Sequence, residues 1–344
     1  MVKQKRKKVV KQNEMSNYTK AIEINPYDAN LYYKRGLSEY DLKDYSVAIQ
    51  DFSKAIEINP QFANAYEIRG GANIALDNFK EALWDFSKTI ELDSQYTIAY
   101  IMRGFAKTFL NDLRGAIQDY TKAIELDPFN AKTYYYRGAA KRQLQDYKGA
   151  IQDHSKAIEI EPKLGKAYFS RGIAKNDLQD YNGAILDFSK AIEFDPLDAD
   201  AYNNRGNSKN YLQDFIGAMQ DFNKAIEINP QDAKFYKNRG DSKYYLQDYR
   251  GAIQDYTKVI EINPQNSDAY YNRGNAKVEI KDYRGAVQDY TEVIEINPQF
   301  STAYYNRGIS KYHNGDKDGA CLDWSKAGEL GQVKAYDMIK EYCN

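Results

Sequence analysis

Residues 199–232 read ADAYNNRGNSKNYLQDFIGAMQDFNKAIEINPQD, and the pattern of this stretch indicates the fold. Steps of three and four residues place one set of side chains on a single helix face: Ala201, Tyr202, Arg205, Ser208 and Leu212. A second set follows with the same helical spacing: Ala218, Met219, Phe222, Ala225 and Ile226. Asp198 and Asp214 precede the two sets and can cap their free N–H groups. Pro230 ends the second set because proline cannot donate to a helix ladder. The stretch therefore predicts two helices joined by a tight turn.

The same unit recurs along the sequence with a step of 34 residues. The prolines keep this step, with Ser94 filling the one gap: Pro26, Pro60, Pro128, Pro162, Pro196, Pro230, Pro264 and Pro298. A glycine of the first helix keeps it too: Gly36, Gly70, Gly104, Gly138, Gly172, Gly206, Gly240, Gly274 and Gly308. This period and this spacing of Gly, Ala and Pro resemble the tetratricopeptide repeat.

The resemblance covers residues 29–331 as nine repeats, of which repeat one is 29–62 and repeat six is 199–232. It implies an all-α fold, a right-handed α-solenoid (superhelix) of tetratricopeptide helix-turn-helix repeats. A single unit cannot bury its apolar face, so neighbours must stack to form a continuous core. In the family, the first helix of each pair lines the inner, concave groove.

The two ends of the sequence depart from the repeat. Residues 1–13 are expected to be a basic tail or a degenerate first helix, and residues 14–28 a partial repeat that holds only a second helix. The last repeat drifts toward a pattern that resembles Sel-one-like repeats, and residues 332–344 are expected to form a C-terminal capping helix. We interpret Cys321 and Cys343 as small packing residues, not as a redox pair.

Arginine and aspartate fill two complete columns of the repeat. The arginines lie on the first helix: Arg35, Arg69, Arg103, Arg137, Arg171, Arg205, Arg239, Arg273 and Arg307. The aspartates lie on the second: Asp51, Asp85, Asp119, Asp153, Asp187, Asp221, Asp255, Asp289 and Asp323. We predict an ion pair between the two helices of each unit, such as Arg205 with Asp221. The functional alternative, an arginine ladder that binds phosphate, is disfavoured because the aspartates would cancel its field.

Three further columns are interpreted as structural. A tyrosine column (Tyr202 in repeat six) is expected to pack between helices, and a lysine column (Lys209) to form a solvated helix face. A glycine column early in the second helix (Gly217) should cost up to about 1 kcal/mol at each position relative to alanine. The sequence offers no physical reason for these glycines beyond a close helix approach.

Asparagines beside the arginine column form the candidate binding site in repeats six to nine. The predicted peptide-binding residues are Asn204, Asn207, Asn238, Asn272, Asn275 and Asn306. An asparagine amide both donates and accepts, so a row of amides can bind the backbone of an extended peptide. The row resembles the asparagine ladder in the superhelix of O-linked N-acetylglucosamine transferases. The alternative is that these asparagines follow the family consensus and have no binding role.

The earlier repeats have apolar and aromatic side chains at the corresponding positions. The candidate apolar groove residues are Ile98, Ile101, Met102, Phe105, Tyr135 and Tyr136. Such a surface could accept apolar side chains of a partner, or the same face of a second copy of the protein. The alternative is packing between adjacent repeats.

The composition excludes several classes of function. The formal charge is −1, from 48 basic and 49 acidic residues, so no net field attracts nucleic acid. A basic run at the N-terminus could bind acidic ligands, but a solvated tail is the preferred interpretation: Lys3, Lys5, Arg6, Lys7, Lys8 and Lys11. No stretch reaches the roughly 20 apolar residues of a membrane span, and no apolar signal segment follows Met1. These features favour a cytoplasmic protein.

The sequence shows no catalytic constellation. It has no phosphate-binding loop, no His-Glu-x-x-His motif and no Gly-x-Ser-x-Gly elbow. Two histidines and two cysteines are too few and too scattered for a metal site, so we expect no metal and no cofactor. The sequence therefore predicts a non-catalytic scaffold that binds a protein or peptide in its concave groove. The alternative is a regulatory or targeting module of a larger enzyme or secretion assembly.

Overall fold

The structure, a computed structural model, describes residues 2–343, with side chains from Val10 onward. Within that range the regular elements are α-helices, and none of them combines the length and apolar character needed to cross a bilayer. In sequence order they are α1 (Val2–Ile24), α2 (Ala29–Asp41), α3 (Tyr45–Ile58), α4 (Ala63–Ala75), α5 (Phe79–Leu92), α6 (Thr97–Phe109), α7 (Leu113–Leu126), α8 (Ala131–Gln143), α9 (Tyr147–Ile160), α10 (Gly165–Asp177), α11 (Tyr181–Phe194), α12 (Ala199–Tyr211), α13 (Phe215–Ile228), α14 (Ala233–Tyr245), α15 (Tyr249–Ile262), α16 (Ser267–Glu279), α17 (Tyr283–Ile296), α18 (Ser301–His313), α19 (Lys317–Glu329) and α20 (Lys334–Tyr342).

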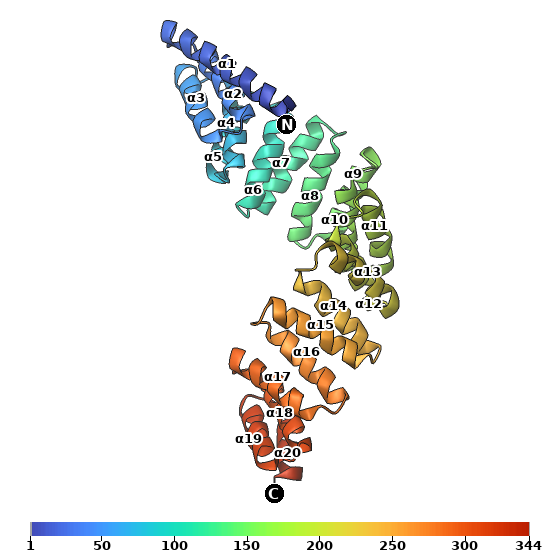
Figure 1. The fold of residues 1–344 in the computed structure, drawn as a ribbon. Helices are drawn as coiled ribbons and strands as arrows, with labels where there is room; N and C mark the ends of the chain where they lie inside the picture. Colours follow the sequence, from blue (N-terminus) through green and yellow to red (C-terminus); the bar gives the residue numbers. More distant parts are fainter. Residues whose placement is uncertain (1, 344) are drawn as a thin grey trace. The chain divides into compact units, whose positions relative to one another are not determined.

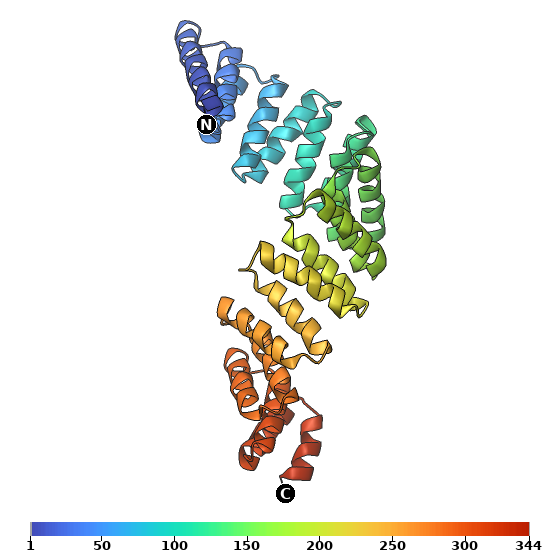
Figure 2. The same cartoon turned by 45° about the vertical axis from the view of Figure 1, so that its right-hand side comes forward.

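The helices pack as consecutive pairs within two compact units, residues 1–174 and residues 175–344. In the first unit α2 packs on α3, α4 on α5, α6 on α7 and α8 on α9, and α3, α5 and α7 also contact the first helix that follows each of them. The second unit repeats this order from α12 to α19. Figures 1 and 2 show these antiparallel pairs from two sides. The structure confirms the all-α, helix-turn-helix solenoid.

The turn inside each pair follows one design. In repeat six, Gln213 has a left-handed backbone (φ 63°) and donates its N–H to the carbonyl of Asn210 at 2.9 Å, which ends the first helix. The next residue, Asp214, then caps the second helix by accepting from the N–H of Gly217 at 2.9 Å. Asp198 caps the first helix by accepting from Ala201 at 3.1 Å. Both capping roles predicted from the sequence are confirmed.

The structure supplies the missing reason for the glycine at the third position of the second helix. A Cβ built on Gly217 would lie 2.2 Å from a carboxylate oxygen of Asp214, so a side chain there would displace the cap. The same geometry recurs in the seven pairs Asp112–Gly115, Asp146–Gly149, Asp180–Gly183, Asp214–Gly217, Asp248–Gly251, Asp282–Gly285 and Asp316–Gly319. Repeats one and two have Val47 and Glu81 instead, and their Asp44 and Asn78 make no such bond.

Small residues lie where the two helices of a pair cross. A Cβ on Gly206 would be 2.7 Å from the ring of Phe222, and Ala218 is fully buried. An aromatic ring of the second helix covers the corresponding glycine in other repeats as well, for example Phe52 over Gly36. The close crossing expected from the sequence is therefore present.

At the N-terminus one continuous helix replaces the two segments expected from the sequence. Helix α1 runs from Val2 to Ile24 across the expected boundary at residue 13 and packs on α2. Lys11 forms ion pairs with Glu14 at 3.0 Å and with Asp41 of α2 at 3.1 Å. The other basic side chains of the N-terminal run, residues 3–8, lie outside the described side chains.

The C-terminus differs from the expectation in its cysteines. Cys321 of α19 and Cys343, which follows α20, are joined by a disulfide bond, so they are not separate packing residues. Met338 and Ile339 of α20 pack with the buried Trp324 of α19. A close pairing across 22 residues was not readable from two isolated cysteines, because it depends on how α20 folds back onto α19.

Candidate functional site

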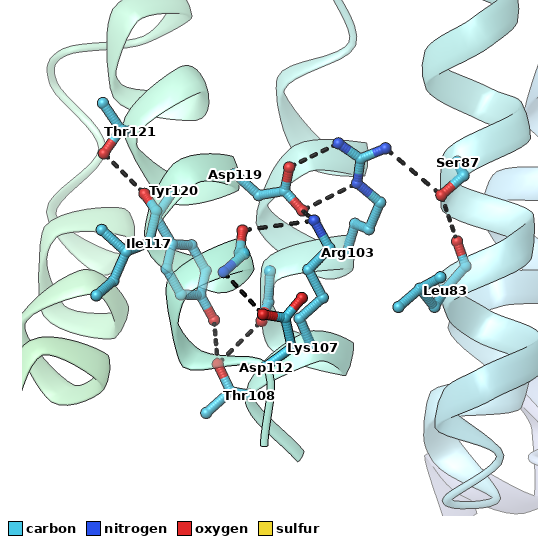
Figure 3. A network of polar contacts seen from close by, with 12 residues as sticks. Leu83, Ser87, Arg103, Lys107, Thr108, Asp112, Ile117, Asp119, Tyr120 and Thr121 are labelled. Atoms are coloured by element: carbon cyan, nitrogen blue, oxygen red, sulfur yellow. Dashed lines mark hydrogen bonds and ion pairs between the residues drawn. The ribbon is translucent and has the colours of Figure 1, made fainter. Parts of the chain in front are cut away.

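The arginine and aspartate columns meet as the sequence predicts. In repeat three, Arg103 of α6 donates to Asp119 of α7 through Nη2 at 2.6 Å and through Nε at 2.9 Å (Figure 3). Its Nη1 reaches Ser87 of the preceding repeat at 3.4 Å. The guanidinium carbon lies 5.5 Å from the ring centre of Tyr100, which gives the tyrosine column a structural role. Bidentate, largely buried pairs of this kind are among the stronger polar contacts in proteins.

A lysine also contacts the column aspartate in each of repeats three to nine. Lys107 lies 2.8 Å from Asp119 Oδ2 and donates to the carbonyl of Gly115 at 3.4 Å, and its side chain is 17% exposed. We call Arg103, Lys107 and Asp119, and their equivalents, the Arg–Asp–Lys triad. The lysine–aspartate pairs are Lys107–Asp119, Lys141–Asp153, Lys175–Asp187, Lys209–Asp221, Lys243–Asp255, Lys277–Asp289 and Lys311–Asp323. The lysine column is therefore not a solvated face, as the sequence suggested, but part of the contact between paired helices.

Repeats one and two keep the arginine–aspartate pair and lack the lysine. Repeat one has Glu39 at this position, 4% exposed and with its Oε2 unpaired among the described residues. Burial and the nearby Asp51 raise the pKa of Glu39 to about 7. Repeat two has Asn73, which donates to Asp85 at 3.1 Å. Burial raises the pKa of Asp85, although the hydrogen bond from Arg69 opposes the shift.

In the second unit, three adjoining pockets run along the first helices α12, α14, α16 and α18. The largest, of about 750 Å³, is lined by Asn207, Asn210, Tyr211, Gln213, Phe215, Lys237, Asn238, Asp241 and Tyr245. The next, of about 300 Å³, is lined by Asp241, Tyr244, Tyr245, Tyr256, Asn272 and Asn275. A third, of about 200 Å³, is lined by Tyr244, Asn275, Val278, Glu279, Tyr290, Asn306 and Ile309. We call this row the asparagine groove; consecutive pockets share lining residues.

The structure brings five of the six predicted asparagines to this groove. They are Asn207, Asn238, Asn272, Asn275 and Asn306. The sixth, Asn204, lines none of these pockets, and its amide donates to the carbonyl of Asp200 in its own helix at 2.8 Å.

The five groove asparagines differ in what their amides already contact. Asn238 donates to Asn203 at 2.8 Å, and Asn306 donates to Asn275 at 3.3 Å, so these side chains join neighbouring repeats. Asn207 and Asn272 have no side-chain hydrogen bond to any described residue. Their donors and acceptors are therefore not engaged by described side chains, whereas Asn238 and Asn306 form part of the contact between repeats.

Aromatic and charged residues of the groove were missed by sequence reasoning. Tyr245 stacks on Phe215 with ring centres 5.2 Å apart and remains 67% exposed. Lys237 and Asp241 form an ion pair at 2.7 Å across one helical turn. The sequence feature that could have indicated them is a tyrosine at the end of the first helix in two adjacent repeats, Tyr211 and Tyr245, both exposed in the structure.

Buried tyrosines support the floor of the groove. Tyr256 donates to Asp241 at 2.8 Å, and burial together with this carboxylate raises the pKa of Tyr256. Burial and Glu279 raise the pKa of Tyr244 to about 12. These phenols therefore stay protonated at neutral pH and act as donors that fix the acidic side chains of the groove.

The apolar residues predicted in the first unit lie mostly between helices. Ile101 and Tyr136 pack around the buried Tyr120, and Met102 packs against the core of repeats two and three. Phe105 contacts Tyr136 with ring centres 5.9 Å apart. Tyr135 also lies in this packing, beside the core that holds Ala131, Ala157 and Ala167. Ile98, at 53% exposure, is the member of the set that is open to solvent.

Among the described residues, no three His, Cys, Asp or Glu side chains lie close enough together to hold a metal ion. Each column aspartate of repeats three to nine contacts a lysine of the paired helix, and this arrangement indicates a structural role.

Family models match most of the repeated region. The description "Tetratricopeptide repeat" covers residues 29–62, 98–130, 131–164, 199–232 and 267–300, and "TPR repeat" covers residues 174–210 and 240–281. The chain belongs to the tetratricopeptide repeat family. No curated protein matches it in sequence.

Solved structures of tetratricopeptide repeat proteins share the fold. The C-terminal part of a repeat protein from Cytophaga hutchinsonii has 20% identity and a TM-score of 0.59 over 68% of this protein and 97% of its own length. A repeat protein from Parabacteroides merdae has 20% identity and a TM-score of 0.54 over 72% and 99%. YrrB, described as a TPR protein with an unusual peptide-binding site, has 27% identity and a TM-score of 0.47 over 54% and 95%. At the family level, such an array is a scaffold for protein–protein interaction.

Proposed function

We propose that this protein is a non-catalytic scaffold that binds an extended peptide segment of a partner protein in the asparagine groove. The observation that carries the proposal is the pair of half-buried amides of Asn207 and Asn272, which line the pockets and have no partner among the described residues. An amide in such a position can satisfy both a backbone N–H and a backbone carbonyl of a peptide.

The remaining groove residues would add specificity to this backbone recognition. Tyr211 and Tyr245 offer exposed rings for apolar side chains, and the Lys237–Asp241 pair offers both charges to polar side chains. The ligand is proposed to be protein and not nucleic acid, because the arginines that could bind phosphate are engaged by buried aspartates.

A peptide library selected on the intact protein provides the ligand for the test. The selected peptide is then titrated against the wild type and against the double variant Asn207→Ala/Asn272→Ala. Loss of two amide hydrogen bonds, at about 0.5–1.5 kcal/mol each, should weaken binding roughly tenfold. The melting temperature should be unchanged, because neither amide forms a hydrogen bond with the rest of the protein.

A matched control replaces exposed asparagines outside the groove, Asn30→Ala/Asn64→Ala, and should bind like the wild type. Equal affinity of all three proteins would remove the two amides from the mechanism.

A cytoplasmic location stays a prediction. The Cys321–Cys343 bond weighs against it, because disulfides persist mainly in oxidising compartments.

A further inference from the structure

Repeat two differs from the seven repeats after it at three positions that meet in space. Asn73 stands where those repeats have the triad lysine, and Glu81 where they have the capping glycine. Trp84 stands where they have glutamine or leucine. All three line one pocket of about 440 Å³ within residues 1–174, together with Ile49, Ser53, Arg69, Lys80 and Asp85.

The later repeats show what chemistry this position accepts. In repeat six the ammonium of Lys209 lies between an aspartate oxygen and a backbone carbonyl, at 2.8 Å from Asp221 and 3.3 Å from the carbonyl of Gly217. The aspartate accepts this ammonium while it also accepts from the arginine at 2.6 Å. One carboxylate therefore accommodates both cations.

Repeat two keeps the carboxylate and lacks the triad lysine. Asp85 has a side chain only 1% exposed and is held by Arg69 at 2.6 Å and by the neutral Asn73 at 3.1 Å. Glu81 adds a carboxylate to the pocket lining, and its backbone carbonyl takes the sequence position of the glycine carbonyl that binds lysine in repeat six. The raised pKa of Asp85, caused by burial, is a shift that an added cation would reverse.

The pocket also has a surface for an alkyl group. The indole of Trp84 is 49% exposed, and Ile49 of the preceding repeat lies in the same lining. The guanidinium carbon of Arg69 lies 5.6 Å from the Trp84 ring centre, within the range of a cation–π contact.

We propose that this pocket binds a primary alkylammonium group, with the ammonium near Asp85 and the Asn73 amide and the alkyl part against Trp84 and Ile49. The group is either the side chain of a lysine in a partner protein or a free aliphatic diamine. The site shares no residue with the asparagine groove, so it adds a second recognition element to the scaffold.

The test titrates three probes into the intact protein: 1,5-diaminopentane, an acetylated and amidated Gly-Lys-Gly peptide, and the same peptide with its lysine Nε acetylated. The indole N–H resonance of Trp84, assigned by its loss in Trp84→Phe, reports binding. We expect saturable shifts with the diamine or the lysine peptide and at least tenfold weaker binding of the acetylated peptide. Tighter binding of the lysine peptide identifies a protein ligand, and tighter binding of the diamine identifies a free amine.

Two variants locate the site. Asn73→Lys supplies the ammonium from within the protein itself, so binding should fall at least tenfold while the melting temperature rises. Trp84→Gln restores the residue of most other repeats and, read by calorimetry, should weaken binding without a change in the melting temperature. The proposal is overturned if the wild type shows no saturable shift with either amine, or if Asn73→Lys binds them as the wild type does.

Discussion

The first two repeats and the seven that follow hold their helix pairs together with different side chains. Repeats three, four and six to nine use one scheme, an Arg–Asp–Lys triad between the helices and an Asp–Gly cap at the turn. Repeat five shares the lysine–aspartate contact and the cap. Figure 3 shows the triad of repeat three. Repeat one has Glu39 and Val47 at the lysine and glycine positions, and repeat two has Asn73 and Glu81. Both groups form the same helix–turn–helix units, so the fold tolerates the loss of the lysine and the cap. The small crossing residues and the arginine and aspartate columns are common to both groups.

The largest expected difference between the two groups concerns the central aspartate. Asp221→Ala leaves Arg205 and Lys209 facing each other without their carboxylate, and breaking such a buried pair costs about 3–5 kcal/mol. Asp51→Ala in repeat one should cost less, because Arg35 can then pair with Glu39 and because a repulsive neighbour of Glu39 is removed. Native-state hydrogen exchange should measure the loss of stability in each variant separately, because the stability of a solenoid is local to a repeat and its neighbours.

The control for that pair of variants is a double-mutant cycle of Arg205→Ala and Asp221→Ala. Equal losses for Asp221→Ala and Asp51→Ala, together with zero coupling in the cycle, would contradict the triad as the stabilising contact.

The next largest effect should come from converting repeat one to the scheme of the later repeats. The Glu39 carboxylate is buried, and one of its oxygens has no hydrogen-bond partner among the described residues. Glu39→Lys puts an ammonium group in its place, which can reach Asp51. Removing an unsatisfied buried group and adding a charged hydrogen bond should stabilise the repeat by about 1–3 kcal/mol. The reverse change in repeat six, Lys209→Glu, should destabilise it by a similar amount. The two variants are compared by urea unfolding and hydrogen exchange, and a loss of stability in Glu39→Lys would count against the comparison.

The pH dependence of the first repeat should differ from that of the later ones. The pKa of Glu39 is raised from 4.5 to about 7 by burial and by Asp51, while Arg35 opposes the shift. The folded state therefore binds an extra proton at Glu39 between these pH values. The contribution of Glu39 to the stability of repeat one is fully present below about pH 4.5 and is lost as the pH rises through about 7.

The measurement is hydrogen exchange of α2 amides across this pH range, corrected for the intrinsic exchange rate. The loss from Glu39 is expected to reach about 3 kcal/mol for the wild type and to be absent for Glu39→Gln. A wild-type profile as flat as that of Glu39→Gln would show that Glu39 stays ionised. Other groups near this site, Lys11, Glu14, Asp41, Asp44 and Asp51, are common to both proteins.

The period of 34 residues was enough to predict the pairs, the turns and the arginine–aspartate contact, because each is set by residues within one unit. The lysine partner was missed, although Lys209 lies one helical turn from Arg205 and so on the same face toward Asp221. The sequence predicted most of the asparagines that line the groove. It could not predict which amides lack a partner, like Asn207, and which are hydrogen-bonded, like Asn238, because this depends on the residue 32 to 35 positions away in the neighbouring repeat. The disulfide was likewise not predictable, because it depends on how the C-terminal helix packs on the helix before it.

The smallest expected effect distinguishes the cap of the later repeats from the uncapped turn of repeat one. Alanine has a helix propensity about 1 kcal/mol better than glycine, and an aspartate cap contributes about 1 kcal/mol. In the wild type, Gly217→Ala should therefore be nearly neutral, because the new Cβ, 2.2 Å from the Asp214 carboxylate, displaces the cap as it improves the helix. In an Asp214→Ala background the cap is already absent, so the same change should stabilise repeat six by about 1 kcal/mol.

Repeat one supplies the natural counterpart: Asp44 makes no side-chain cap bond and position 47 is valine, so Val47→Ala should have the same effect with or without Asp44→Ala. Thermal and urea unfolding of the single and double variants give the coupling energy between the two positions in each repeat. Equal coupling energies in repeats one and six would mean that the capping carboxylate is not the reason for glycine at this position.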